Sequence, residues 1–302
     1  MKRQITFRVE RKKAMKRTAH NRDPMGHTKR RPLAGAALFV LFTAFLLLGL
    51  RYGHTVIRRL GLDPPLDPLP ILMYHHVAED GDVCNEMSVT VSRLREDFQY
   101  LADRGYTPVL PRGLLDPDTL PDKPVLLTFD DGYTSNYIYL FPLLREFGFH
   151  AVISPIVGMP DGLDREDGYC TWEMLREMSA SGLVEIGSHT WSCHNLDNHG
   201  MTYPNGANGI QRQAGETDGE FQARVLDDIQ KSYDRIWQEI GAPPTCFAYP
   251  FGAVDPDADA LIDALFPVSL ITWPDTADLA DGTRRMPRWT VTMDAPPSRY
   301  VR

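Results

Sequence analysis

Positive charge is scarce in most of this chain. Residues 32–302 contain 20 Lys and Arg against 38 Asp and Glu, a balance of −18, whereas residues 1–31 contain 12 basic residues and two acidic ones. A surface with that excess of acidic groups repels nucleic acids and other anionic polymers. We therefore expect no nucleic acid among the partners of the acidic part, and a polymer that binds there should be neutral or cationic.

Long uncharged runs are also rare, and the clear example is the 18 residues of Leu33–Leu50. A helix of that length is about 27 Å long, which is roughly enough to span a bilayer. A buried core helix is the alternative, but this run is apolar on all faces and follows the basic block. Few basic residues come after it, so the positive-inside rule places the N-terminus in the cytoplasm. We predict a basic cytoplasmic tail at 1–31 and a single-pass transmembrane signal anchor at 32–50.

No cleavage motif follows the apolar run, so we expect the anchor to be retained and the rest of the chain to lie outside the cytoplasm, at the cell membrane. Residues 51–69 contain three prolines and are typical of a stiff linker. Internal repeats and low-complexity tracts are absent from the remaining part, 70–302, which is long enough for one sizeable core.

Short apolar runs alternate with segments of helical periodicity throughout residues 70–302. This alternation predicts an α/β fold with a mainly parallel sheet, closed into a barrel. We place a helix N-cap at Ser92 and a long loop at 195–219. The other expected helices lie near 137–147, 172–180, 221–240 and 257–265, and the expected strands near 71–76, 125–129, 150–154, 183–187, 245–249 and 268–273.

Two carboxylates, Asp130 and Asp131, follow the apolar run Val125–Phe129, which is typical of a buried parallel strand. Loops at the carboxyl ends of such strands build active sites. Neighbouring residues on an extended backbone point in opposite directions, so we expect one acid to bind a metal and the other to transfer a proton. For these residues alone, a strand followed by an Asp-Gly turn is the alternative.

Two histidines, His189 and His194, follow the expected strand at 183–187. Imidazoles are common ligands of transition metals. With one carboxylate from the Asp-Asp pair they form a His₂Asp set that leaves a position open for water, as in hydrolytic metal sites. The sequence therefore predicts one divalent ion, with zinc as the first choice and cobalt, nickel or iron as the others.

Three motifs, in this order, resemble those of the polysaccharide deacetylases of carbohydrate esterase family 4, the NodB-homology domain. They are T-F-D-D-G at 128–132, S-H-T with a later His at 188–194, and aromatic-Pro-aromatic-Gly at 249–252. The resemblance covers about 70–302 and implies a distorted (β/α) barrel. It implies that Asp130 is the general base and that the metal ligands are Asp131, His189 and His194.

The sequence departs from the family pattern in three respects. The two histidines are five residues apart where many members have four, Ala248 stands where the family has an Arg that steadies the base, and no His follows His199. These departures resemble the branch that deacetylates poly-β-1,6-N-acetylglucosamine, in which the domain is circularly permuted. The run I-L-M-Y-H-H-V is similar to the late strand of the family, and this likeness makes His75, rather than the adjacent His76, the proton donor.

The resemblance implies a hydrolase of carbon–nitrogen bonds other than peptide bonds, which removes acetyl groups from the N-acetylglucosamine units of an extracytoplasmic polysaccharide. The backbone N–H of Phe251 is the expected second donor to the oxyanion, and Tyr249 belongs to the same substrate-binding turn. Trp273 is a candidate to line a sugar groove, with a core aromatic as the alternative. Machinery for polysaccharide synthesis or export is a further expected partner.

Two other functions stay open from the sequence. The substrate could be peptidoglycan or a chitooligosaccharide, and the domain could be a membrane-tethered glycan-binding module without turnover. The cysteines also leave alternatives, because an exported domain permits disulfides and four cysteines allow three full pairings. Cys193 could instead be a soft metal ligand beside His194. The four are Cys84, Cys170, Cys193 and Cys246.

Overall fold

The computed structural model describes residues 68–82, 85–161, 168–194 and 209–301. The predicted cytoplasmic tail and signal anchor, most of the predicted linker, and Cys84 lie outside these ranges. Within them, no helix combines the length and the apolar character needed to cross a membrane.

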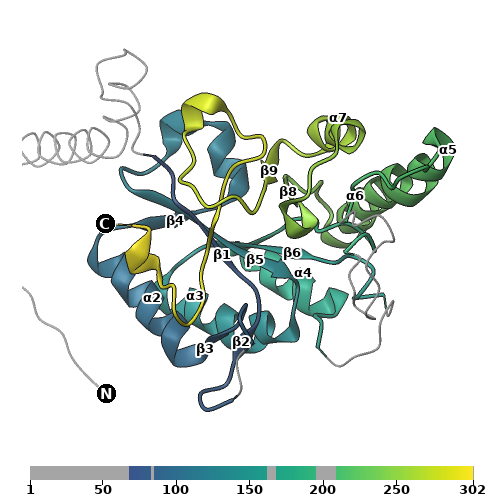
Figure 1. Ribbon diagram of the computed structural model, residues 1–302. Helices are drawn as coiled ribbons and strands as arrows, with labels where there is room; N and C mark the ends of the chain where they lie inside the picture. Colours follow the sequence, from purple (N-terminus) through teal and green to yellow (C-terminus); the bar gives the residue numbers. More distant parts are fainter. Residues whose placement is uncertain (1–67, 83–84, 162–167, 195–208, 302) are drawn as a thin grey trace, which may run out of the picture. The chain divides into compact units, whose positions relative to one another are not determined.

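Parallel strands form the centre of the domain (Figure 1). The larger sheet has the order β10-β1-β5-β6-β7, and β4 pairs with the beginning of β5. Its strands are β1 (Ile71–Tyr74), β4 (Thr107–Val109), β5 (Pro124–Asp131), β6 (Ala151–Pro155), β7 (Val184–Ile186) and β10 (Trp289–Thr290). Two smaller parallel pairs are β2 (Val77–Ala78) with β3 (Val89–Thr90), and β8 (Cys246–Ala248) with β9 (Val268–Leu270).

Isolated bridges connect the β8–β9 pair to the larger sheet on both sides. Ser188, which follows β7, pairs with Phe247 of β8, and Leu270 of β9 pairs with Met286, shortly before β10. The strands therefore form a ring in which the β8–β9 pair is joined to the larger sheet by single bridges instead of full ladders. This arrangement is the distorted α/β barrel that the alternation of strands and helices predicts.

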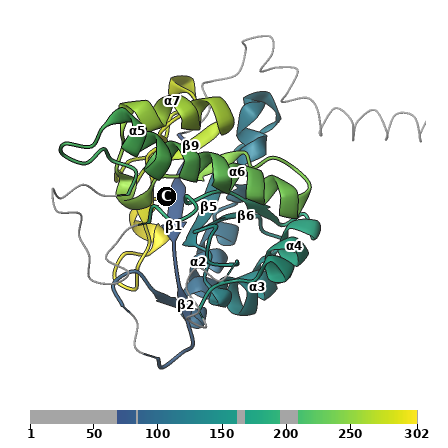
Figure 2. The ribbon, with the colours of Figure 1, turned by 90° about the vertical axis from the view of Figure 1, so that its right-hand side faces the viewer.

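Helices cover the outside of this ring. Figures 1 and 2 show α2 and α3 on one side of β1 and β5, and α6 and α7 on another. The helices are α2 (Val91–Asp103), α3 (Phe141–Phe147), α4 (Trp172–Ala180), α5 (Asp218–Phe221), α6 (Asp227–Ile240) and α7 (Pro256–Leu265). Single π-helical turns at Asn136–Leu140 and Gln222–Leu226 precede α3 and α6, and 3₁₀ turns lie at Pro111–Leu115, Pro117–Thr119, Pro250–Gly252, Leu279–Asp281 and Pro297–Arg299.

Most predicted elements are present, but several boundaries are wrong. The N-cap of α2 is Thr90, whose side chain accepts from the N–H of Arg93, and Ser92 lies inside the first turn. The strand predicted to reach residue 273 ends at Leu270. The helical stretch before α6 begins at Asp218, within the predicted loop, because Thr217 and the third residue of the helix form a capping box. Strands β4 and β10 were not predicted, since two or three residues carry too little periodicity to be recognised.

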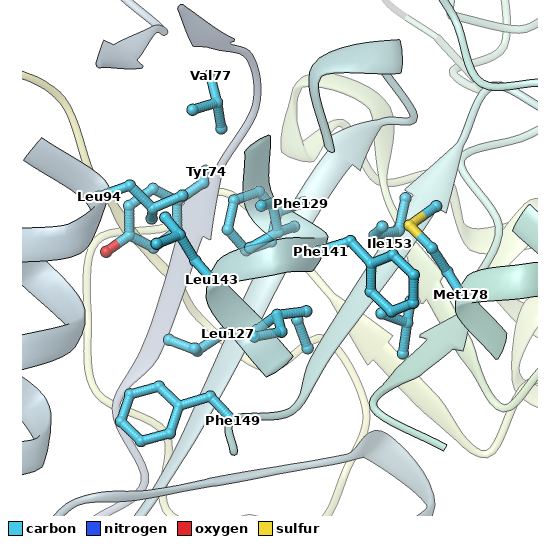
Figure 3. Packing of buried hydrophobic residues seen from close by; sticks show 14 of the residues in the cluster. Tyr74, Val77, Leu94, Leu127, Phe129, Phe141, Leu143, Phe149, Ile153 and Met178 are labelled. Atoms are coloured by element: carbon cyan, nitrogen blue, oxygen red, sulfur yellow. The ribbon is translucent and has the colours of Figure 1, made fainter. Parts of the chain in front are cut away.

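Apolar side chains on the larger sheet divide between two clusters. One lies between the sheet and the outer helices (Figure 3), and the other fills the barrel interior. The outer cluster includes Tyr74, Leu94, Leu127, Phe129, Phe141 and Ile153. The inner cluster includes Ile71, Leu126, Val152, Cys246, Val268 and Leu270.

The alternation along β5 determines where the first acid of the pair lies. Leu126 belongs to the inner cluster, and side chains two and four positions further along a strand share its face. Thr128 and Asp130 therefore face the barrel interior above Leu126. Asp130 is the last inward-facing residue before the strand ends, and it is buried.

Candidate metal centre and active site

A pocket of about 470 Å³ opens where the carboxyl ends of the strands meet. Residues of the segments that follow β1, β7 and β8 line it together with the last two residues of β5. Parallel strands bring their carboxyl ends to one edge, which is why positions far apart in the chain converge here. Of the predicted site residues, the pocket contains His75, Asp130, Asp131, His189, His194, Tyr249 and Phe251.

The turn at the end of β5 places both acids in this pocket. Asp131 has a φ of 69°, so its backbone is left-handed rather than extended. The expectation that strand alternation would separate the two side chains is therefore wrong. The next residue, Gly132, has a φ of 79°, and a Cβ there would lie 2.6 Å from the Cβ of Pro155, so that only glycine fits this turn. The two carboxylates differ in their partners, not in the pocket they face.

Asp130 is paired with Arg288, a residue that the sequence did not single out. Arg288 Nη1 donates a hydrogen bond to Asp130 Oδ1 at 2.8 Å, and Nη2 lies 2.8 Å from Oδ2. Both side chains are buried. Burial raises the pKa of Asp130, but the charge and hydrogen bond of Arg288, together with His189 and His75, outweigh that effect and lower the pKa to about 2. Asp130 is therefore ionised at any working pH.

Arg288 supplies beside Asp130 an arginine that the sequence lacks at position 248. It lies directly before β10, which pairs with β1, and its guanidinium also donates to the hydroxyl of Thr128 and to the carbonyl of Ile271. These four contacts fix the position of the charge beside Asp130. The signal that could have revealed it is the run M-P-R-W-T-V at 286–291, in which an arginine adjoins a short β-prone segment.

Asp131 faces the two histidines. Its Oδ1 lies 3.6 Å from His189 Nε2 and 3.4 Å from His194 Nε2, and one ligand atom from each of the three residues lies within 4.8 Å of the others. Two ligands of one tetrahedral zinc ion are about 3.3 Å apart, given metal–ligand bonds of about 2.0–2.2 Å. The spacing of these donor atoms therefore fits a single small divalent ion.

The chemistry of the donors fits a cation as well. Burial lowers the pKa of His189 to about 4, so its ring is neutral near pH 7. Its Nδ1 lies 2.7 Å from the carbonyl oxygen of Ala248, to which it donates, and the lone pair of Nε2 consequently faces Asp131 Oδ1. That oxygen is buried and has no hydrogen-bond partner among the described residues. A lone pair and a carboxylate oxygen turned toward each other repel unless a cation lies between them.

Both histidines after β1 line the pocket, because the extended strand ends at Tyr74 and the alternation ends with it. Their surroundings differ. The charge of His75 acts on the pKa of both Asp130 and His194, whereas the charged group that acts on His76 is Asp82. Alternation along an extended strand would turn only one of these adjacent histidines into the pocket, and this expectation from the sequence is wrong. His75 is nevertheless the one that acts electrostatically on the predicted base.

The aromatic residues predicted for the substrate occupy different positions. Phe251 is 42% exposed, and its ring lies 4.5 Å from that of His194, centroid to centroid. Tyr249 is buried, and its hydroxyl donates to Asp259 at 2.6 Å. Trp273 is 67% exposed, which rules out the core alternative, but it adjoins the pocket-lining Thr272 and is not itself part of the lining.

The described cysteines are all unpaired. Cys170, Cys193 and Cys246 are buried free thiols, so the part of the chain that the structure describes contains no disulfide. The thiol of Cys193 donates to the carbonyl of Arg224, and burial raises its pKa well above the ordinary value. Cys193 is not among the three residues whose ligand atoms come together at the candidate metal centre, so burial and packing describe it better than metal ligation.

Residues 118–265 match the polysaccharide deacetylase family. The chain is 32% identical over 202 residues to the poly-β-1,6-N-acetyl-D-glucosamine N-deacetylase of Escherichia coli K12, a match that covers 60% of this chain and 30% of that protein. The chain thus spans less than a third of the length of this relative.

Two solved structures are similar to the domain. IcaB from Ammonifex degensii superimposes with a TM-score of 0.64 at 26% identity, covering 78% of this chain and 96% of that one. A de-N-acetylase from Aggregatibacter actinomycetemcomitans gives a TM-score of 0.64 at 25% identity, covering 75% and 95%. The chain therefore contains a polysaccharide deacetylase domain, and the family recognised from the motifs is confirmed. That family consists of hydrolases that act on N-acetyl groups.

We predict that Arg288→Met destabilises the protein by roughly 3–5 kcal/mol at pH 7, because it leaves a buried charge on Asp130 without its partner. The sign of the pH dependence should also reverse. In the wild type the lowered pKa of Asp130 adds stability that is lost as pH falls below about 4. The variant loses the largest contribution that lowers this pKa, so burial should dominate and raise it, and stability should be lost as pH rises through the raised value.

Urea unfolding at several pH values measures both effects. Arg285→Met is the matched control, since Arg285 forms an exposed pair with Asp259 and should cost at most about 1 kcal/mol. The double variant Arg288→Met with Asp130→Asn should regain stability at pH 7, because no buried charge remains. Equal losses in the two single variants would contradict the prediction.

Proposed function

We propose that this protein is a metal-dependent N-deacetylase that hydrolyses the acetamide of N-acetylglucosamine units in a polysaccharide, and that poly-β-1,6-N-acetylglucosamine is its substrate. The observation that carries the proposal is that one pocket contains two carboxylates with different partners. Asp130 is paired with the fixed Arg288, and Asp131 faces His189 and His194, whose pKa values are both lowered by burial to about 4. The named activity of the Escherichia coli relative supports the choice of polymer. The negative charge of residues 32–302 suits a polymer that gains amines as it is deacetylated.

Asp131, His189 and His194 would hold the ion, and zinc is the first candidate. When bound, such an ion supplies a Lewis acid and lowers the pKa of water to about 7. Asp130 takes the proton of the attacking water, and Arg288 keeps its carboxylate ionised and aimed at the pocket. The backbone N–H of Phe251 donates to the oxygen that becomes negative as the carbonyl is attacked. His75 donates a proton to the departing amine.

Removing the base and removing a ligand should have different effects. Asp130→Asn should abolish deacetylation and retain the metal, because the amide keeps the size of the carboxylate but cannot accept a proton. His189→Ala should lose both the metal and activity. Zinc per chain and acetate release from the acetylated polymer measure the two properties. A wild-type protein that stays metal-free under zinc supplementation would sink the assignment of the metal ligands and favour the non-catalytic glycan-binding alternative. An active Asp130→Asn variant would show that the base lies elsewhere.

We predict that His75, and not His76, protonates the leaving amine. Losing a positioned general acid typically costs on the order of 10²–10⁴ in rate. His75→Ala should show that loss on an acetamide, whereas an activated aryl acetate has a good leaving group and should be hydrolysed at a rate much closer to that of the wild type. His76→Ala is the matched control from the same turn. Equal losses of ester and amide hydrolysis, or a larger amide-specific loss in His76→Ala, would reassign the acid and remove the main support for a circularly permuted domain.

We also propose that residues 32–50 anchor the protein in the cell membrane, with the domain outside the cytoplasm, where it could meet the machinery that makes or exports its polymer. The support is the charge step across Leu33–Leu50 in the sequence. Protease added to cells with an exposed outer face of the membrane should digest residues 70–302 and leave a cytoplasmic marker intact. Full protection of the domain until the membrane is lysed would contradict this placement.

A further inference from the structure

The loop that carries both predicted histidine ligands is held by a carboxylate that does not belong to the ligand set. Asp228, in the first turn of α6, accepts three hydrogen bonds of 2.8 Å each. The N–H of Trp191 donates to Oδ1, and the N–H and the hydroxyl of Ser192 donate to Oδ2. All three therefore fix the stretch between His189 and His194.

The same face of α6 holds the other end of the loop. Ser232, one helical turn after Asp228, lies 2.8 Å from the hydroxyl oxygen of Ser188. That oxygen in turn accepts from the N–H of Thr190 at 3.2 Å. Because residues four apart project from one face of a helix, Asp228 and Ser232 contact the loop on both sides of His189.

The helix cannot rotate to relax these contacts. Ile229, the neighbour of Asp228, is fully buried in an apolar cluster that includes Cys193 and Phe247. Turning α6 to move Asp228 away from the loop would expose Ile229 to water. Exposing a buried Ile side chain costs about 1.5–3 kcal/mol, so burial sets the angle at which the carboxylate is presented.

The loop needs to be held because its backbone is strained. Thr190, a β-branched residue, has a φ of 69°, which lies in the left-handed region. Conformations of this kind cost about 1–3 kcal/mol and persist where surrounding contacts impose them. On the side away from α6, the N–H groups of Val157 and Gly158 donate to the carbonyls of Thr190 and Trp191 at 2.9 Å each. Asp228 holds the loop from α6, where it accepts from the N–H groups of Trp191 and Ser192.

We propose that Asp228 is a positioning residue of the metal centre. Through the backbone of Trp191 and Ser192, its carboxylate holds the loop in the conformation in which both histidines face Asp131. It does not touch the ion, and its loss weakens the binding of zinc. The proposal rests on the metal centre of the proposed function and adds a residue that acts on it from another helix.

The chain offers a matched pair of substitutions for the test. Asp228→Asn keeps the size of the side chain but turns an NH₂ group toward N–H donors, so at least one hydrogen bond is lost. Asp227→Asn makes the same change in charge at the adjacent position, where the contact is a hydrogen bond from Gln222. Zinc dissociation constants of the full chain are measured by competition with a chromophoric chelator. Asp228→Asn should bind zinc about 10–100-fold more weakly, and Asp227→Asn should match the wild type.

Two further measurements separate positioning from a general loss of stability. The melting temperature without zinc reports on the fold, and kcat at saturating zinc reports on the assembled site. Positioning predicts that saturating zinc restores most of kcat in Asp228→Asn. A variant with a lower melting temperature and an unchanged zinc dissociation constant would overturn the proposal.

If Asp228→Asn does not fold, Ser192→Ala decides the question, because it removes one of the three hydrogen bonds. A zinc dissociation constant about threefold higher or more supports the proposal, and an unchanged one overturns it. The outcomes also separate this proposal from the one it rests on. A wild type that binds no zinc and releases no acetate defeats the proposed function, whereas a zinc-binding, active wild type with an equally tight Asp228→Asn defeats the positioning role alone.

Discussion

The ion pair between Asp130 and Arg288 is the contact on which both the barrel and the candidate site depend. It joins the end of β5 to the segment before β10, 158 positions later in the chain, across the interior of the barrel. A buried carboxylate is tolerated only when it is paired, and removal of its partner typically costs several kcal/mol. The fold therefore brings the C-terminal segment to β1 and β5 at the same place where it keeps the predicted base charged. One contact thus ties the C-terminal segment to β5 and keeps the predicted base charged.

The same pair imposes a condition on the chemistry. A carboxylate with a pKa of about 2 is a weak base and cannot take a proton from ordinary water at a useful rate. In the proposed mechanism the attacking water must first be made more acidic, which is what an ion held by Asp131 and the two histidines would do. The arginine that secures Asp130 would thus make the proposed base dependent on the neighbouring ligand set. This dependence gives a physical reason for the two acids to be adjacent in the chain and yet to have different partners.

Residues whose role depends on local sequence were predictable, and residues whose role depends on distant contacts were not. Asp130, Asp131, His189 and His194 follow recognisable strands, so the convergence of parallel strand ends was enough to bring them together. Arg288 was missed because the adjoining strand β10 has two residues, and no local pattern shows that this arginine reaches Thr128.

The direction of Asp131 was also missed. Alternation assumes an extended backbone, but the backbone of Asp131 is left-handed, and the next residue, Gly132, packs closely on Pro155. Asp228 was not recognised as a site residue either, because its proposed role depends on a distant contact, that of α6 with the loop.

The extent of the family match bears on how the site is assembled. Residues 118–265 contain the predicted base, the three ligands and Phe251, but neither His75 nor Arg288. These two come from opposite ends of the domain and are nevertheless neighbours in the sheet, because β1 pairs with β10 and Leu72 lies opposite Trp289. A side chain reaches the pocket according to the place of its strand in the barrel, whatever the order of that strand in the chain. A strand moved from the end of a domain to its beginning can therefore still present the same group, provided that it pairs with the same neighbours. In this chain β1 pairs with both β5 and β10, and this pairing brings His75 into the pocket that contains Asp130, as its proposed role of proton donor requires.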